Sequence, residues 1–289
     1  RPERSWNTAG RMRLSRERLA HRGGLSIRSA EATQTFNGNV GAVFSGLTVS
    51  TSAGLTLTGT NLTGVIGSNA VSLGRGTLTL DNSGGNTSAG GGRISDSATL
   101  SFSGGKLALI GHSSGTSETV GVPTFTTFSN TVSVTSNSSS APTTLTFNNT
   151  SGNISTSITT INFTGEGGIL GAGGNNPAIK FATPLFTAPS SGLLTSSSGA
   201  ESNLGRAIVT TGGDVNWAGY DPTNGIIALT NTPRDQTNLA SAGLSERIGF
   251  APTGPGTTTT LAANLTTAGV IKITPGATGQ SLDLAPEEV

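Results

Sequence analysis

The sequence predicts an all-β protein made of stacked coils, and three observations lead to this prediction. Between Gly76 and Gly111, apolar and small polar residues alternate in short runs, such as T-L-T-L at residues 77–80, and a period of two indicates strands. Aromatic residues make up only 4% of the chain and 43 residues are glycine, so side chains that could fill a thick core are scarce. Similar runs recur along the chain, which is typical of a solenoid whose coils pack on one another.

The spacing of four apolar pairs predicts how the coils stack. Each pair has one Thr or Ser between its two apolar residues, and the first residues of successive pairs are 23, 22 and 45 positions apart. The last step is about twice 22, and the skipped position falls near residues 122–125, where Pro123 interrupts the pattern. A step of this size suits one turn of a parallel β-helix, or β-solenoid. We therefore expect one buried column that contains Leu55/Leu57, Leu78/Leu80, Leu100/Phe102 and Leu145/Phe147.

Fifteen short segments are expected to form strands. Each is rich in Thr, Val, Ile or Leu and is bounded by Gly, Asn, Ser or Pro, which favour turns. Residues 187–205 and 230–258 are expected to be loop excursions from the stack. The expected strands are residues 43–50, 55–58, 70–73, 77–80, 98–102, 106–110, 131–135, 143–147, 157–163, 178–181, 206–210, 225–229, 259–265, 270–273 and 281–284.

The composition divides the chain into an Arg-rich head, residues 1–33, and a β-solenoid body, residues 34–289. Residues 1–30 contain eight Arg and two Glu, a net charge of +6, whereas the rest of the chain carries −5. The head is expected to be disordered, apart from a short helix that could form over residues 12–21. An Arg-rich arm can bind nucleic acid or an anionic membrane. A solvated terminus is the simpler interpretation, and we expect no nucleic-acid partner.

Other features of composition bound the class of protein. The chain has no Cys, which excludes disulfides and thiolate chemistry. No stretch approaches the roughly 18 apolar residues of a membrane-spanning helix, so no membrane span is expected. No secretory signal is visible in residues 1–30, and the first residue is Arg instead of Met. We therefore expect a fragment or a processed product of a larger protein.

Several Gly-bounded motifs share one style along the chain. They are GTLTLDNSGGN from residue 76, RISDSATLSFSGGKLALIG from residue 93 and SETVGV from residue 117, with later segments at residues 214–220, 225–229 and 273–284. In these motifs the chain resembles the autotransporter-associated β-strand repeat of large bacterial surface proteins. The likeness covers roughly residues 40–285. It implies a right-handed parallel β-helix passenger that is secreted and exposed at the cell surface. Because the repeat defines a scaffold, the resemblance supplies no catalytic residues.

Few residues are candidates for catalysis or metal binding. The chain has two histidines, His21 in the head and His112 in a Gly-His-Ser-Ser turn, and neither has partners at metal-ligand spacing. Serines follow His112, but serine is abundant throughout, so we interpret His112 as a solvated turn residue and not as part of a catalytic triad. We expect no enzyme activity, no metal and no cofactor.

The Gly-rich turn around Asp81 and Asp96 is the next candidate for metal binding. Asp and Asn favour turns because they bond to their own backbone, so we expect a turn here and no calcium site. Arg93 is expected to pair with Asp96 on the surface, which would contribute little to stability.

One acidic and aromatic cluster supports an alternative function. Asp214 and Asp221 flank Trp217 and Tyr220, and aromatic rings can stack on sugars. A carbohydrate-binding or polysaccharide-cleaving β-helix would use these four residues, with the two carboxylates placed on either side of a glycosidic bond. The competing interpretation is that Trp217 and Tyr220 only cover an excursion from the stack.

The function that we expect is a non-enzymatic scaffold that acts as a spacer, an adhesin stalk or an envelope component. Its partners would be surface glycans or other envelope proteins. An extracellular or cell-surface location follows from the family resemblance.

Overall fold

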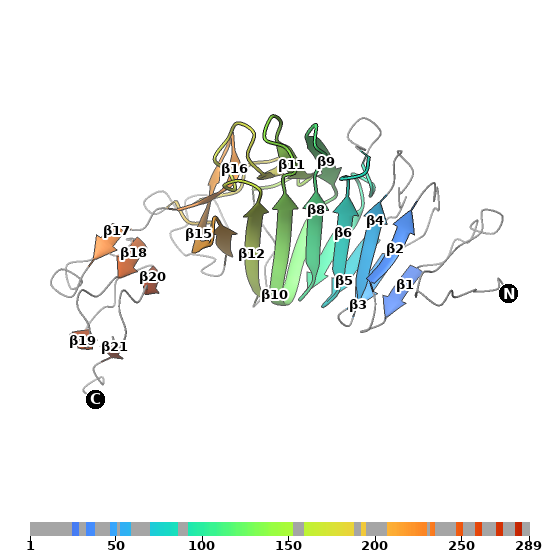
Figure 1. The fold of residues 1–289 in the computed structure, drawn as a ribbon. Helices are drawn as coiled ribbons and strands as arrows, with labels where there is room; N and C mark the ends of the chain where they lie inside the picture. Colours follow the sequence, from blue (N-terminus) through green and yellow to red (C-terminus); the bar gives the residue numbers. More distant parts are fainter. Residues whose placement is uncertain are drawn as a thin grey trace, which may run out of the picture.

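The protein is all-β throughout the part of the chain that its computed structural model describes, as the sequence predicts. The described residues are 25–28, 33–37, 47–50, 53–58, 70–85, 92–152, 159–187, 192–194, 207–229, 232–234, 247–250, 258–261, 270–273 and 281–284. They contain strands and no helix (Figure 1). Within these ranges there is accordingly no helix of the length and apolarity that crossing a membrane requires. The helix that we expect over residues 12–21 lies outside the described residues.

Most of the strands lie in three parallel rows (Figure 1). The first row is β1 (Leu25–Arg28), β3 (Leu47–Ser50), β5 (Ala70–Gly74), β7 (Thr99–Ser103) and the first half of β10 (Pro123–Thr135). The second row is β2 (Thr33–Asn37), β4 (Gly54–Thr58), β6 (Thr77–Asp81), β8 (Lys106–Ile110), the second half of β10, β12 (Thr159–Glu166) and β14 (Ala207–Thr211). The third row is β9 (Thr116–Val120), β11 (Thr143–Phe147) and β13 (Ala178–Phe181). Because β10 pairs with strands of both the first and the second row, those two rows form one continuous sheet.

Alternation of residue type explains why these segments form strands. In β4, Leu55 and Leu57 are buried while Thr56 and Thr58 are partly exposed, and β6 repeats the pattern. Successive side chains of a strand point to opposite faces, so T-L-T-L places leucine on the inner face and threonine on the outer one. Threonine is β-branched and fits a pleated, half-exposed surface. Each strand buries only about two large side chains, and their burial depends on the strands that stack on both sides.

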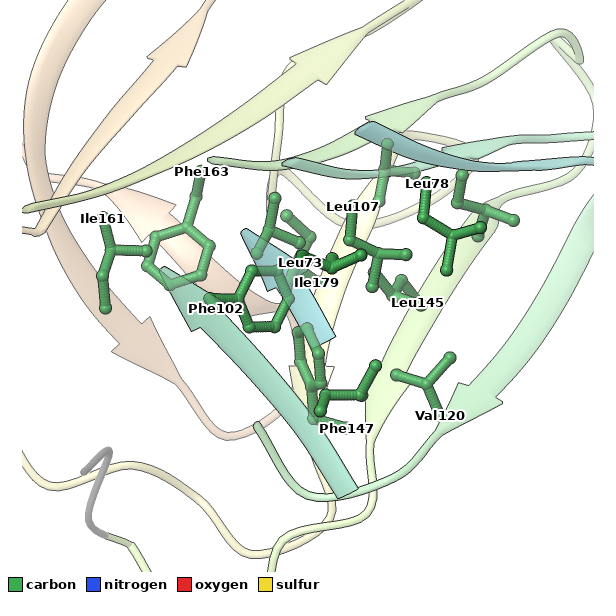
Figure 2. Close-up of a cluster of buried hydrophobic side chains, with 14 of the residues drawn as sticks. Leu73, Leu78, Phe102, Leu107, Val120, Leu145, Phe147, Ile161, Phe163 and Ile179 are labelled. Carbon is green, nitrogen blue, oxygen red and sulfur yellow. The ribbon is translucent and has the colours of Figure 1, made fainter. Parts of the chain in front are cut away.

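The buried apolar side chains of all three rows meet in one cluster. Figure 2 shows Leu73 and Phe102 from the first row, Leu78 and Leu107 from the second, and Leu145 and Phe147 from the third in this cluster. Aromatic rings are aligned by the strand register. Phe102 stacks on Phe125 with centroids 4.7 Å apart, and Phe147 stacks on Phe181 at 5.0 Å. This arrangement of parallel strands around one apolar cluster is compatible with a parallel β-helix that has a thin core.

The expected single column of apolar pairs is wrong beyond its first step. Leu55 does pair in register with Leu78, as predicted. The next residues in that column, however, are Leu107 of β8 and Val132 of β10.

The remaining pairs belong to other rows. Leu100 and Phe102 lie in the first row, where Leu100 pairs with Val71. Leu145 and Phe147 lie in the third row. The pairs look alike because every row requires the same alternation, so their spacing does not reveal which row each one joins. All of them are buried, and their prediction as core residues is confirmed.

The step between paired strands is not constant either. In the second row, Leu78 follows Leu55 by 23 residues, but Phe163 follows Val132 by 31. From β8 onward, each step contains a strand of the third row, since β9 precedes β10, β11 precedes β12 and β13 precedes β14. Pro123 does not interrupt this arrangement, as the sequence pattern suggested, but begins β10 and pairs with Leu100.

The strands after β14 depart from the three rows. β15 (Asp214–Asp221) pairs antiparallel with β14 and with β16 (Gly225–Ala228). β17 (Thr232–Arg234), β18 (Arg247–Phe250) and β20 (Val270–Ile273) form a parallel sheet, and β19 (Thr258–Leu261) and β21 (Ser281–Leu284) form another. Paired residues are 23 positions apart between β18 and β20 and between β19 and β21, as for Arg247 with Val270 and Thr258 with Ser281. Between β17 and β18 they are 16 positions apart, as for Thr232 with Ile248.

Several strands have the boundaries that the sequence predicts, and the structure also contains strands that the sequence analysis did not predict. The bounds of β8, β11, β13, β20 and β21 agree with the expected ranges to the residue. Six strands, β1, β2, β9, β15, β17 and β18, have no counterpart among the expected strands, and the last two fall within the expected excursion at residues 230–258. β1 and the start of β2 lie within residues 1–33, the range that the composition assigns to the Arg-rich head.

Candidate functional site

The four residues of the predicted carbohydrate site lie on one strand, β15. The sequence forms a tight hairpin before it, because Gly212 and Gly213 both have positive φ, 59° and 86°, which suits a two-residue turn. The first half of β15 pairs with β14 and the second half with β16. Strand geometry therefore decides which of the four side chains can meet.

The two predicted carboxylates stand at opposite ends of β15. Asp214 is its first residue and Asp221 its last, and a strand of eight residues places them roughly 23 Å apart. Paired catalytic carboxylates of glycosidases lie about 5–9.5 Å apart. Asp221 has a turn role, since its Oδ1 accepts hydrogen bonds from the backbone N–H groups of Thr223 at 2.8 Å and Asn224 at 2.7 Å. The two carboxylates thus do not form a hydrolytic pair.

Tyr220 is held against the third row by its hydroxyl group. The hydroxyl donates to the backbone oxygen of Phe181 at 3.1 Å and accepts from the Phe181 N–H at 3.0 Å. The ring meets Phe181 edge-on, with centroids 6.1 Å apart. Burial raises the pKa of Tyr220, the bond with the Phe181 backbone opposes that rise, and the charge of Asp221 adds to it. Tyr220 closes the end of the β11–β13 sheet, which agrees with the covering role rather than with a sugar-stacking role.

Trp217 stands three positions before Tyr220, at the end of the half of β15 that pairs with β14. Its backbone oxygen accepts a hydrogen bond from the Leu229 N–H at 2.9 Å. The side chain is partly buried, and its indole Nε1 is enclosed without a hydrogen bond. The structure therefore places the four predicted residues on one strand but does not bring their side chains together.

His112 has the turn role that its sequence context predicts. Its Nδ1 accepts from the Ser114 N–H at 3.1 Å and lies 2.7 Å from the Ser114 hydroxyl. Asp81 likewise forms a turn, because its Oδ1 accepts from the backbone N–H and the hydroxyl of Ser83. No group of three His, Asp or Glu side chains within the described ranges is arranged to hold a metal ion.

A buried polar cluster, which the sequence patterns did not indicate, lies where the third row begins. Arg93, Glu118 and Asn82 are fully buried. The Nε of Arg93 donates to Asn82 Oδ1 at 2.8 Å, and the backbone N–H of Arg93 donates to the Glu118 carboxylate. Burial lowers the pKa of Arg93, and the charges of Glu118 and Asp81 oppose that shift. The expected surface pair of Arg93 with Asp96 is wrong, since Arg93 is an interior residue.

A second unpredicted feature is the corner between the first and second rows, formed by Arg75, Gly104 and Phe128. These residues stand on three successive coils, and all have left-handed backbone, with φ of 61°, 77° and 59°. The Arg75 guanidinium lies 4.3 Å from the centroid of the Phe128 ring, and 53% of Phe128 is exposed. A Cβ on Gly104 would lie 3.1 Å from the Phe128 Cβ and 3.2 Å from the Arg75 Cγ, so the three residues are stacked closely.

The backbone of this corner is strained at Arg75 and Phe128. Left-handed backbone costs roughly 1–2 kcal/mol for each residue with a side chain, and glycine avoids that cost. A cation–π contact between exposed groups contributes about 0.5–1 kcal/mol. The contact between the two side chains therefore offsets only part of the strain of the two residues. No sequence pattern marks either residue, because left-handed backbone is a property of the corner and not of Arg or Phe.

The chain matches no family model, no curated protein and no solved structure.

Proposed function

We propose that the chain is a non-enzymatic β-solenoid scaffold of the secreted or cell-surface type, which acts as a spacer, an adhesin stalk or an envelope component. The observation that carries the proposal is the in-register stacking of short parallel strands with one inner apolar face. Leu55, Leu78, Leu107 and Val132 follow one another in such a column and are all buried. A structure of this kind gains stability from each contact between neighbouring coils.

A right-handed parallel β-helix is the fold that best fits these rows. Consecutive strands of one row are parallel and are joined by connections that pass through the other rows. Crossover connections between parallel strands of one sheet are right-handed in about 98% of cases. The 23-residue steps from β18 to β20 and from β19 to β21 equal the step from Leu55 to Leu78, which supports a repeat of similar coil length.

The outer faces suit a scaffold because they carry small hydroxylated residues. Thr48, Ser72, Ser101 and Thr124 follow one another across the first row, and Thr56 and Thr79 are paired in the second. These side chains are partly exposed and uncharged. The proposed relation to autotransporter passengers, and with it the extracellular location, rests on the sequence motifs alone, as does the choice of surface glycans or envelope proteins as partners.

Antibody labelling of cells that produce the protein tests the proposed location. We expect intact cells to bind an antibody raised against the chain, and brief protease treatment of intact cells to remove the epitope. Labelling that appears only after the cells are permeabilised would contradict a surface role. Small-angle scattering of the purified chain tests the shape, for which an elongated particle is expected.

The alternative function, polysaccharide binding or cleavage at β15, is tested on Asp214→Asn and Trp217→Ala. The separation of the two carboxylates along β15 argues against cleavage by this pair. We expect the unaltered chain to release no reducing sugar from polysaccharides. Release of reducing sugar that disappears in Asp214→Asn would establish the alternative.

A further inference from the structure

We propose that the corner formed by Arg75, Gly104 and Phe128 binds an acidic carbohydrate, a pyranose ring that carries a carboxylate or a sulfate. The proposal goes beyond the scaffold role and does not depend on it. It also places carbohydrate recognition away from the four residues of β15.

Backbone strain is the first observation behind this proposal. Arg75 and Phe128 hold left-handed φ values that glycine adopts without cost, and Gly104 occupies the equivalent position on the coil between them. The contact of the two side chains offsets only part of this strain. Strained residues that persist in a rigid framework are concentrated at ligand-binding sites, and the inference runs from the observed outliers to a function.

The corner is held rigidly from inside by Asn130. Its Oδ1 accepts the backbone N–H groups of Gly104 at 2.8 Å and Gly105 at 3.2 Å, and its Nδ2 donates to the backbone oxygens of Thr127 at 3.2 Å and Phe128 at 3.4 Å. Asn130 itself is fully buried. A ligand would therefore meet side chains whose backbone is already fixed, which lowers the entropic cost of binding.

The chemistry of the exposed groups selects the ligand class. A half-exposed phenyl ring offers an apolar surface to the C–H face of a sugar ring. The guanidinium of Arg75, held over one face of that ring, can bind a carboxylate or a sulfate with two parallel hydrogen bonds and leaves the other face to the sugar. Thr127 and Ser129 flank Phe128 on β10, and Thr160 of β12 is paired with Ser129. All three residues are exposed, and their hydroxyl groups can bond to sugar hydroxyls. Charge and stacking together favour an acidic sugar over a neutral one.

Titration calorimetry with short oligosaccharides tests the proposal on the full chain. The probes are trigalacturonate for the carboxylate, a heparin-derived hexasaccharide for the sulfate and maltotriose as the neutral control. The variants are Arg75→Gly and Phe128→Gly, which should fold because glycine accepts the corner conformation. We expect both variants to melt at the same or a higher temperature than the unaltered chain and to bind the preferred acidic probe about tenfold more weakly.

Two controls separate this site from general attraction of anions. Ile169→Ser removes an exposed apolar side chain elsewhere and should leave binding unchanged. The Arg-rich residues 1–30 are identical in all variants, so any binding that they contribute cancels in the comparison. Binding of either acidic probe that weakens in both corner variants supports the proposal. It is overturned if neither acidic probe binds, if the corner variants bind as well as the unaltered chain, or if a short oligonucleotide binds equally well and is lost in the same variants.

Discussion

Among the described residues, the strands before β9 lie in two rows and those from β9 onward include a third row, and the buried side chains of the two regions differ. In β3 to β6, the buried side chains are aliphatic, such as Leu47, Leu55 and Leu80, and paired residues are 23 or 24 positions apart. Beside the third row the step varies, with 25 residues between Leu107 and Val132 and 31 between Val132 and Phe163. The interior there contains the stacked aromatic pairs Phe102–Phe125 and Phe147–Phe181.

The third row begins at a cluster of buried polar side chains. Glu118 points inward at the register position that Leu145 occupies on the next strand. β9 pairs with β11 and is the edge of this sheet within the described residues. Arg93 and Asn82 pack at this edge, so a charged cluster closes the place where an apolar column has no earlier member. The comparison teaches that the third row of this chain begins, within the described residues, at a buried polar cluster and not at an apolar side chain.

Leu80→Asp gives the largest expected effect, because it disrupts the aliphatic interior of β3 to β6. It buries a charge among aliphatic side chains, so we expect a loss of about 4 kcal/mol or more in the free energy of unfolding, enough to unfold several coils. Urea unfolding followed by circular dichroism measures it. Thr79→Asp, one position away on the outer face, is the matched control and should cost less than about 1 kcal/mol. Full retention of stability in Leu80→Asp would refute the assigned inner face.

Glu118→Ala tests the buried polar cluster at the start of the third row. It leaves the buried Arg93 charge without its carboxylate, and we expect a loss of about 3–5 kcal/mol in the same urea experiment. The double variant Glu118→Leu with Arg93→Met should recover a large part of this loss, because apolar residues of similar volume replace the whole pair. Losses that simply add in the double variant would show that the two groups are not coupled.

Asn130→Ala removes the internal support of the corner that joins the first and second rows. The N–H groups of Gly104 and Gly105 would lose their acceptor, which we expect to cost about 1–3 kcal/mol. Asn148→Ala, an exposed asparagine with a single bond to Asp96, is the control and should change stability much less. Equal effects of the two substitutions would argue against a special role of the corner.

Tyr220→Phe gives the smallest effect and acts at the far end of the third row. Loss of the hydroxyl bonds to Phe181 should cost about 1 kcal/mol at neutral pH. Because the pKa of Tyr220 is raised on folding, its contribution is fully present below about pH 10, the value of an unfolded tyrosine, and is lost as the pH rises through the folded pKa.

An absorbance titration measures this shift directly, because Tyr220 is the one tyrosine of the chain. Ionisation should occur at a higher pH in the folded protein than in urea, and Tyr220→Phe should lose less stability between neutral and alkaline pH than the unaltered chain does. Ionisation at the same pH in both states would contradict the buried position.

Local sequence patterns predicted which residues are buried in strands, but they did not predict which row each strand joins. Alternation identified Leu55, Leu78, Leu100 and Leu145 as core residues, since burial of every second side chain is a local property of a strand. Their distribution over three rows depends on the length and path of the connections between them. β9 was missed because its inward Glu118 breaks the apolar alternation that marks a strand.

The candidate site shows the same division between local and long-range information. The sequence correctly placed Asp81 and His112 in turns, because their partners are two residues away. It could not show that Arg93 is buried, since Glu118, which fixes it, lies 25 residues further along the chain. The clustering of Asp214 with Asp221 was misleading, because neighbours in sequence lie far apart when the intervening chain is an extended strand.

The register of the rows also determines how the protein would respond to tension. The backbone hydrogen bonds between paired strands run from one coil to the next, across steps such as Leu55 to Leu78. A force applied along the stack would load one pair of strands at a time instead of shearing a whole sheet. Each rupture would release the residues of one step, so the extension should rise in small, repeated increments at modest force.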